Sequence, residues 1–270
     1  MKIIHFSDIH TGGRFDRFNA LFDKRIIGTL NYKLRRRRHV IWENLQKAID
    51  IIEREKPDIV INTGDITSVS EPGEFAEALR RLQPIVDNNN HTFINVPGNH
   101  DHYVDNNECI KSKEATYNAL NRDLLPIENF PHRLEKGGVT FIMVDESRPN
   151  SGTQSSGYLK PEDLKKIQLW ASEAKEKPVV LVGHYPLKNK LGEPLATRRA
   201  LENGNELVSM LEKGEITVNL CGHIHAPFIR EEKSGSLEIC AGSLTIGGHL
   251  NKLEFDSDSK SFSHSWIKVN

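Results

Sequence analysis

The chain has 270 residues, of which 27% are charged and 37% hydrophobic, and its formal net charge is −1. No segment approaches the roughly 18 uninterrupted apolar residues of a membrane-spanning helix, and the first residues lack the apolar core of a signal peptide. The three cysteines are widely spaced and odd in number, which argues against a disulfide framework. We therefore expect a cytoplasmic globular protein whose cysteines are small buried hydrophobic residues.

Short runs rich in Ile, Val and Leu recur along the chain. Their nearly continuous apolar character is typical of strands that are covered on both faces. They predict strands at residues 3–6, 59–61, 93–96, 139–144, 179–182, 216–220 and 237–241. Near the end of the chain, residues 252–269 alternate in character around a polar turn and predict a closing hairpin.

Segments of helical period lie between several of these strands. Apolar residues repeat at helical spacing over residues 41–52, over 75–86 with Ser70 as a candidate N-cap, and more weakly over 164–174 with Pro161 near the start. Alternation of strand and helix predicts an α/β fold with right-handed crossovers. There is no repeat and no low-complexity linker, so residues 1–270 are interpreted as a single domain.

Residues 11–39 interrupt this alternation because they separate the first strand from its helix. Within them, residues 14–38 carry nine basic and two acidic side chains. The resulting charge of +7 leaves −8 for the rest of the chain. We interpret the segment as a basic insertion over the functional site, and its charge predicts an anionic partner.

Polar clusters follow five of the predicted strands at the point where each strand ends. In an open α/β sheet the carboxyl ends of the strands form the ligand crevice, so these clusters are expected to converge. A glycine before the polar residue allows a sharp turn and a close approach of the backbone. The five clusters are Ser7-Asp8-Ile9-His10, Gly64-Asp65, Gly98-Asn99-His100-Asp101, Gly183-His184 and Gly222-His223-Ile224-His225.

The clusters offer Asp, His and Asn side chains without a nearby thiolate. Imidazole and carboxylate together suit Mn²⁺, Fe or Zn²⁺, and one carboxylate can bridge two ions. Each motif alone is typical of an ordinary polar turn, but five of them at strand ends favour a metal site. Seven ligand groups are too many for one tetrahedral ion, so the sequence predicts two ions, an arrangement suited to phosphoryl transfer.

These motifs, which run from Asp8 to His225, resemble those of the calcineurin-like metallophosphoesterases. The resemblance implies two facing mixed β-sheets flanked by helices, an α/β sandwich with two divalent ions, most simply Mn²⁺, at the strand ends. For one ion it implies the ligands Asp8, His10, Asp65 and His225. For the other ion it implies Asn99, His184 and His223, with Asp65 bridging the two.

The resemblance also implies that His100 is a catalytic imidazole that does not bind metal. The expected reaction is hydrolysis of a phosphodiester or pyrophosphate bond by a metal-bridging hydroxide, with His100 protonating the leaving oxygen or stabilising its charge. Asp101 is a second candidate catalytic residue. It either orients His100 or caps the turn, and the sequence leaves both roles open.

Two subgroups of the family are disfavoured by the residues that follow Asp65. Phosphoprotein phosphatases carry an Asp-Arg pair there, whereas this chain continues Ile66-Thr67-Ser68-Val69, and purple acid phosphatases have a ligand tyrosine in place of Ser68. The remaining bacterial-type members include cyclic-nucleotide phosphodiesterases, nucleotide-sugar lipid hydrolases and nucleases. We therefore expect a phosphorylated small-molecule or lipid-linked substrate.

The core of the insertion, residues 24–38, interleaves apolar residues with positive charge, as expected of an element that meets phosphate headgroups. It loosely resembles members that cleave UDP-2,3-diacylglucosamine in lipid A synthesis, including the chlamydial type. Arg35 and Arg36 are then candidate substrate-binding residues, and the segment could contact an anionic membrane surface. A solvated basic helix is an equal alternative.

Two further classes of function are weighed against the hydrolase. Aromatic residues beside the arginines of the insertion could serve nucleic-acid binding, but the charge of −8 elsewhere argues against it. A non-catalytic scaffold that uses the fold for protein binding would have lost ligands. None of the expected ligands is missing here, so an enzyme is favoured.

Overall fold

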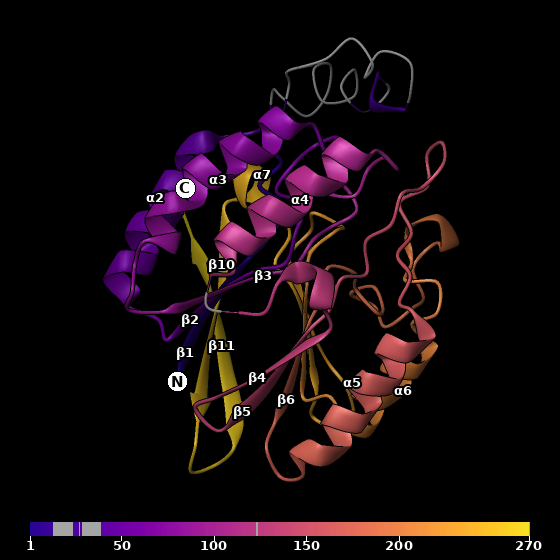
Figure 1. Cartoon of the computed structure of the whole chain (residues 1–270). Helices are drawn as coiled ribbons and strands as arrows, with labels where there is room; N and C mark the ends of the chain where they lie inside the picture. Colours follow the sequence, from indigo (N-terminus) through magenta and orange to yellow (C-terminus); the bar gives the residue numbers. More distant parts are fainter. Residues whose placement is uncertain (13–23, 27, 29–38, 123, 270) are drawn as a thin grey trace.

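The computed structural model describes residues 1–12, 24–26, 28, 39–122 and 124–269. Two β-sheets face each other in the middle of the molecule, and helices cover the outer face of each (Figure 1). The predicted α/β sandwich of two mixed sheets flanked by helices is confirmed. Most of the predicted insertion, including Arg35 and Arg36, lies outside the described residues.

The first sheet has five strands in the order β11-β10-β1-β2-β3. Strands β1 (Lys2–Phe6), β2 (Ile59–Asn62) and β3 (Thr92–Asn95) run parallel. Strands β10 (His249–Asp256) and β11 (Ser261–Lys268) form an antiparallel hairpin, and β10 also pairs antiparallel with β1. The hairpin predicted for the end of the chain is therefore confirmed.

The second sheet has six strands in the order β4-β5-β6-β7-β9-β8. Its central four strands are parallel, and the two edge strands, β4 and β8, are antiparallel to their neighbours. The strands are β4 (His132–Lys136), β5 (Val139–Met143), β6 (Val179–Val182), β7 (Val218–Cys221), β8 (Phe228–Glu231) and β9 (Leu237–Cys240).

Alternate residues of each central strand pack on opposite faces, which explains the continuous apolar runs. Ile59 and Ile61 of β2 point into the core between the two sheets, whereas Val60 packs under the helices. In the second sheet Val180 faces the inter-sheet core, and Leu181 faces the outer helices. Because both faces of a central strand are covered, both sets of side chains have to be apolar.

Three helices cover the first sheet, α2 (Trp42–Glu55), α3 (Pro72–Val86) and α4 (Asn107–Leu120). The second sheet is covered by α5 (Pro161–Ala174) and α6 (Asn205–Lys213). Within the described residues, short turns of helix also occur at η3 (Ile127–Asn129), η4 (Thr197–Arg199) and α7 (Leu244–Gly247).

The start of α3 differs from the sequence-based expectation. The N-cap is Glu71, not Ser70, and Pro72 begins the helix. Ser70 has a positive φ of 62°, and its hydroxyl donates to the carbonyl of His100, so it links two loops instead of capping the helix. Pro161 does lie at the first turn of α5, as predicted.

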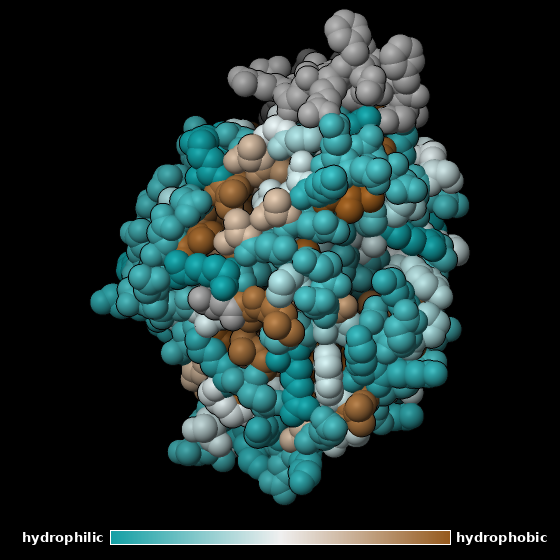
Figure 2. Space-filling model, in the orientation of Figure 1, coloured by the Kyte–Doolittle hydropathy of each residue, from teal (hydrophilic) through white to brown (hydrophobic). Residues whose placement is uncertain are grey.

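Other expectations concern burial and the surface. All three cysteines are buried, as expected. Among the described residues, no helix is both long enough and apolar enough to cross a membrane. The face in Figure 2 is largely hydrophilic, with hydrophobic residues in small separate patches.

Candidate metal centre

The loops at the carboxyl ends of five parallel strands bring the predicted ligands together. Three of these strands belong to the first sheet and two to the second, and the loops meet where the sheets face each other. Asp8 and His10 follow β1, Asp65 follows β2, Asn99 follows β3, His184 follows β6, and His223 and His225 follow β7. The predicted convergence of the five motifs is thus observed.

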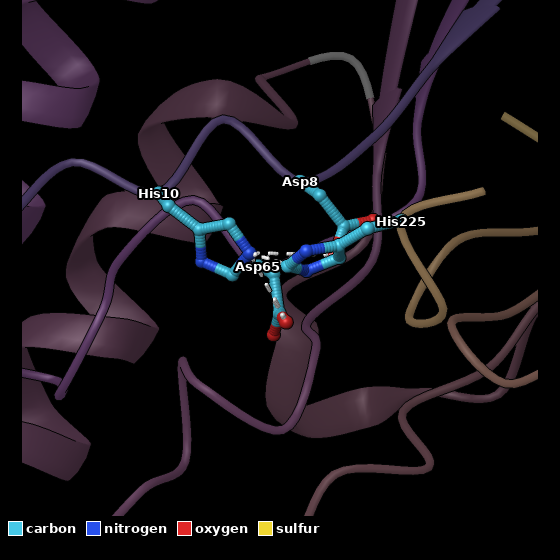
Figure 3. Close-up of side chains that lie close together, drawn as sticks. All are labelled: Asp8, His10, Asp65 and His225. Carbon is cyan, nitrogen blue, oxygen red and sulfur yellow. Dashed lines mark hydrogen bonds and ion pairs between the residues drawn. The ribbon is translucent and has the colours of Figure 1, made fainter. Parts of the chain in front are cut away.

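Asp8, His10, Asp65 and His225 form one group of side chains, and they point toward one another in Figure 3. One potential ligand atom from each lies within 4.8 Å of all the others. The Nε2 atoms of His10 and His225 are 2.9 Å apart, and Asp8 Oδ1 lies 3.1 Å from His225 Nε2 and 3.5 Å from His10 Nε2. Four donors around one point are the geometry of a metal site.

A second group adjoins the first through Asp65. His184 Nε2 lies 3.5 Å from Asp65 Oδ2 and 3.3 Å from Asn99 Oδ1. His223 Nδ1 lies 2.8 Å from the same Asn99 oxygen. Asp65 Oδ2 is also 3.9 Å from His10 Nε2, so this one carboxylate stands between the two groups. The structure thus brings Asn99, His184 and His223 together beside Asp65, and their binding of a second ion stays a prediction.

Backbone carbonyls fix the orientation of three of the imidazoles. His10 Nδ1 pairs with Thr67 O at 3.1 Å, His184 Nδ1 with Thr63 O at 2.6 Å, and His223 Nε2 with Arg199 O at 3.0 Å. A carbonyl only accepts hydrogen bonds, so each of these nitrogens carries the proton in a neutral ring. The other nitrogen of each ring then directs a lone pair into the site, as metal-binding histidines do.

The donor set fits a pair of cations. Asp8 Oδ1 and Asp65 Oδ2 are buried, and no hydrogen bond of good geometry reaches either of them within the described residues. Lone pairs of neutral imidazoles that face carboxylate and amide oxygens repel them unless a positive charge lies between. Burying such oxygens without a partner is costly, and divalent ions would supply the missing partner.

Without a metal ion, burial and the carboxylates act on the pKa values of these histidines. Burial alone would lower the pKa of His184, but the Asp65 carboxylate outweighs it and raises that pKa to about 10. Burial, reinforced by the charge of His184, lowers the pKa of His223 to about 3. In the metal-free protein, a proton on His184 that faces Asp65 can take the place of a metal ion between these two side chains. Metal binding is therefore expected to release a proton.

The backbone of the site is unusual. Positive φ angles occur at Asp8 (56°), His10 (48°), Asp65 (55°), His223 (69°) and His225 (55°). The glycine of the third motif is required by a close approach, because a Cβ at Gly98 would lie 2.2 Å from Asp65 Oδ1 and 2.7 Å from the ring of His184. Left-handed residues other than glycine are uncommon and gather at functional sites.

His100 lies beside the first ligand group. Its ring meets that of His10 edge-on with centroids 5.0 Å apart, and its Nδ1 pairs with Ser68 O at 2.5 Å. Its backbone N–H donates to Asp65 Oδ1 at 2.8 Å. The imidazole is therefore held by the backbone and directed by its Nδ1 contact, close to both ligand groups.

Asp101 is fully buried and accepts hydrogen bonds from the turn around it. Its carboxylate receives the N–H groups of Gly98 and Thr67 at 2.9 Å and the hydroxyl of Tyr117 at 2.7 Å. Burial, together with the charge of Asp65, raises its pKa to about 6 against these hydrogen bonds. Of the two roles left open by the sequence, these contacts favour holding the turn.

One buried residue beside the site was missed by sequence reasoning. Glu146 follows β5, and its carboxylate accepts the backbone N–H groups of His184 at 2.7 Å and Tyr185 at 2.9 Å. It thereby holds the loop that carries a candidate ligand. The signal in the sequence is its position two residues after the apolar run that ends at Val144, close to where the motif residues stand relative to their strands. Arg35 and Arg36 lie outside the described residues, and their role stays a prediction.

Comparison with known proteins identifies the class. The family model for calcineurin-like phosphoesterases matches residues 1–227, and the chain belongs to this family. Its buried Asp/His cluster fits the dimetal site of such enzymes.

The curated relatives are distant. A glycerophosphodiester phosphodiesterase GpdQ from Enterobacter lignolyticus is 25% identical over 64% of this chain and 57% of its own length. A probable GpdQ from Arcobacter nitrofigilis is 32% identical over 64% and 58%. The DNA double-strand break repair protein Mre11 from Saccharolobus solfataricus is 29% identical over 91% and 55%. The chain thus spans a little over half the length of these relatives.

Solved structures share the fold at low sequence identity. A dimetal phosphatase from Danio rerio superposes with a TM-score of 0.62 at 12% identity, covering all of this chain and 99% of its own. The purple acid phosphatase PPD1 from yellow lupin gives 0.61 at 14% identity, covering 99% of this chain and 51% of its own. These likenesses concern the fold alone.

Proposed function

We propose that the protein is a phosphodiesterase that uses two divalent ions to hydrolyse a phosphodiester or pyrophosphate bond. The observation that carries the proposal is the position of Asp65, whose buried Oδ2 faces His10 of one ligand group and His184 of the other. The names of the GpdQ relatives support a phosphodiester substrate. When bound, two such ions would supply a hydroxide nucleophile at neutral pH and stabilise the attacking and leaving oxygens.

The roles of the ligand residues follow from their contacts. Asp8, His10 and His225 would hold one ion, Asn99, His184 and His223 the other, and Asp65 both. The mixture of nitrogen and oxygen donors suits Mn²⁺ best, with Fe or Zn²⁺ as the alternatives. His223 would bind through Nδ1 and His10 and His184 through Nε2, because the opposite nitrogens donate to carbonyls.

His100 is assigned to the leaving group. Its Nδ1 proton is directed to Ser68 O, so the ring would act as the imidazolium, which carries a second proton on Nε2 and passes that proton to the leaving oxygen. Hydrolysis adds water to phosphorus and breaks the bond to the leaving oxygen, which takes the electron pair and this proton. Asp101 would act indirectly, by fixing the turn that carries Asn99 and His100.

Metal titration tests the proposal. Protein stripped with chelator should be inactive on bis(p-nitrophenyl) phosphate, and activity should return with Mn²⁺ as bound metal rises to two ions per chain. Full activity in excess chelator would overturn the whole scheme. Full activity with one ion bound would overturn the dimetal mechanism alone.

Assays on a panel of phosphate esters then narrow the class of substrate. Cyclic AMP, a glycerophosphodiester and UDP-2,3-diacylglucosamine test the cyclic-nucleotide, GpdQ-like and lipid A alternatives in turn. Turnover of only the last would support the resemblance carried by the basic insertion. Two bound ions with no turnover of any ester would favour the non-catalytic scaffold.

A further inference from the structure

Part of the basic insertion packs against the loops that hold His100. Arg25 is 4% exposed, and its Nη1 lies 2.6 Å from Oε1 of Glu71, which is fully buried at the start of α3. The same nitrogen is 3.5 Å from Cys109 Sγ. A buried ion pair fixes position firmly, because separating the partners leaves an uncompensated charge in the interior. The backbone at Arg25 is therefore anchored to the domain.

This anchor places Lys24 beside Tyr103. The Lys24 ammonium lies 4.1 Å from the centroid of the Tyr103 ring and donates to Asn150 O at 2.5 Å. Gly28, one turn further along, also approaches the tyrosine, since a Cβ there would lie 2.8 Å from the Tyr103 hydroxyl oxygen. A cation above an aromatic face is attracted by the negative face of the ring. Separate contacts thus hold the ammonium where it is.

Tyr103 in turn stacks on His100. The two rings are nearly parallel, with an interplanar angle of 10° and centroids 5.5 Å apart. The backbone N–H of Tyr103 donates to Ser70 Oγ, which donates to His100 O, both at 2.8 Å. The Lys24 ammonium and the imidazole assigned to the leaving group therefore contact the same aromatic ring.

We propose that Lys24 binds an anionic group on the leaving group of the substrate, and so selects diesters whose leaving group carries a negative charge of its own. The inference rests on the proposed function, because it needs His100 to mark the leaving-group side. The two ligand groups would hold the reacting phosphate, so an anion on the departing half, which would extend past His100 toward Tyr103, is the part of the substrate that this ammonium would meet. A phosphate or carboxylate carried on the departing half, beyond the leaving oxygen, fits this description.

A matched pair of substrates isolates this charge. Methyl 4-carboxyphenyl phosphate and methyl 4-carbamoylphenyl phosphate have nearly the same size, and in both the aryl oxide leaves. In the Mn²⁺-loaded protein, Lys24→Gln should lower kcat/KM for the carboxylate substrate about five- to tenfold, mainly through KM, and change the carbamoyl substrate by less than about twofold. Added salt should reduce the difference for the native protein.

Two variants serve as controls. Lys24→Arg keeps the charge and should keep the preference, and Lys165→Gln removes one charge from the exposed face of α5 and should change neither substrate. Equal losses on both substrates would make Lys24 structural and overturn the inference, as would no loss on either. Absence of turnover by the native protein on both substrates would instead contradict the proposed phosphodiesterase function itself.

Discussion

The two sheets contribute different chemistry to the candidate centre. Loops of the first sheet supply both carboxylates, the amide and the imidazole of His10, whereas loops of the second sheet supply only imidazoles. Each ligand group draws on both sheets, and direct bonds already cross between them, as from His223 N to Asp8 Oδ2 at 3.1 Å and between His184 Nδ1 and Thr63 O. Both carboxylates thus come from the first sheet, the neutral donors come from both sheets, and neither sheet alone supplies a complete ligand group.

The strongest test of this division changes the shared residue of the first sheet. Asp65→Asn should reduce bound metal at both positions and lower activity by at least about 10⁴-fold, since two-metal catalysis supplies several kcal/mol. His223→Ala, on the second sheet, should remove one ion only. Metal analysis by mass spectrometry measures both. Equal metal content in the two variants would contradict the bridging role of Asp65.

A smaller effect is expected where no ligand is changed. His100→Asn should keep both ions, because His100 contacts the ligand groups without belonging to either, while the rate on a poor leaving group falls about 10²- to 10³-fold. The loss should shrink for p-nitrophenolate, which needs little help in leaving. An emptied metal site, or an unchanged rate on a methyl or glycerol leaving group, would remove His100 from this role.

The last effect concerns stability on the first-sheet side and is the smallest in terms of activity. Glu74 of α3 is fully buried, and burial raises its pKa to about 8 against the N–H groups of Val69 and Ser68. Between the ordinary pKa of about 4.5 and 8, the folded state holds a proton that the unfolded state has lost. The free energy of unfolding should therefore fall as the pH rises through this window.

Denaturant titration of Glu74→Gln against the native protein measures the effect. The advantage of the Gln variant should grow between about pH 5 and pH 8, to at most about 3 to 5 kcal/mol. Glu77→Gln, on the same helix but half-exposed and paired with Arg80 and Arg81, is the matched control and should show no such trend. A pH-independent difference for Glu74→Gln would show that its pKa is not raised.

The candidate centre was predictable because its signal is local. A polar residue directly after a buried apolar run has to face either solvent or a ligand. Five such positions lie where parallel strands end, so they gather at one edge of the two sheets. The same reasoning located the strands at 59–61 and 179–182, which became β2 and β6. Family resemblance then supplied the grouping of ligands, which spacing alone does not give.

What could not be predicted depends on partners far apart in the chain. Helix α4 buries Lys113, Thr116 and Tyr117 beside its apolar residues, so it shows no apolar stripe in the sequence. The pairing of Arg25 with Glu71 joins residues 46 positions apart, and composition marks Arg25 only as one more basic side chain. For the same reason Lys24 could not be distinguished from the other cations of the insertion.

The left-handed backbone of the ligand loops limits how this centre could be transplanted or evolved. Asp, Asn and His are the residue types other than glycine that tolerate such φ angles best, and five of the candidate ligands need them. Exchanging one for Glu or Cys would keep a metal-binding atom but strain the main chain. A designer who copies only the side-chain positions onto ordinary strands or helices would therefore lose the geometry, so the loops themselves are the unit to graft.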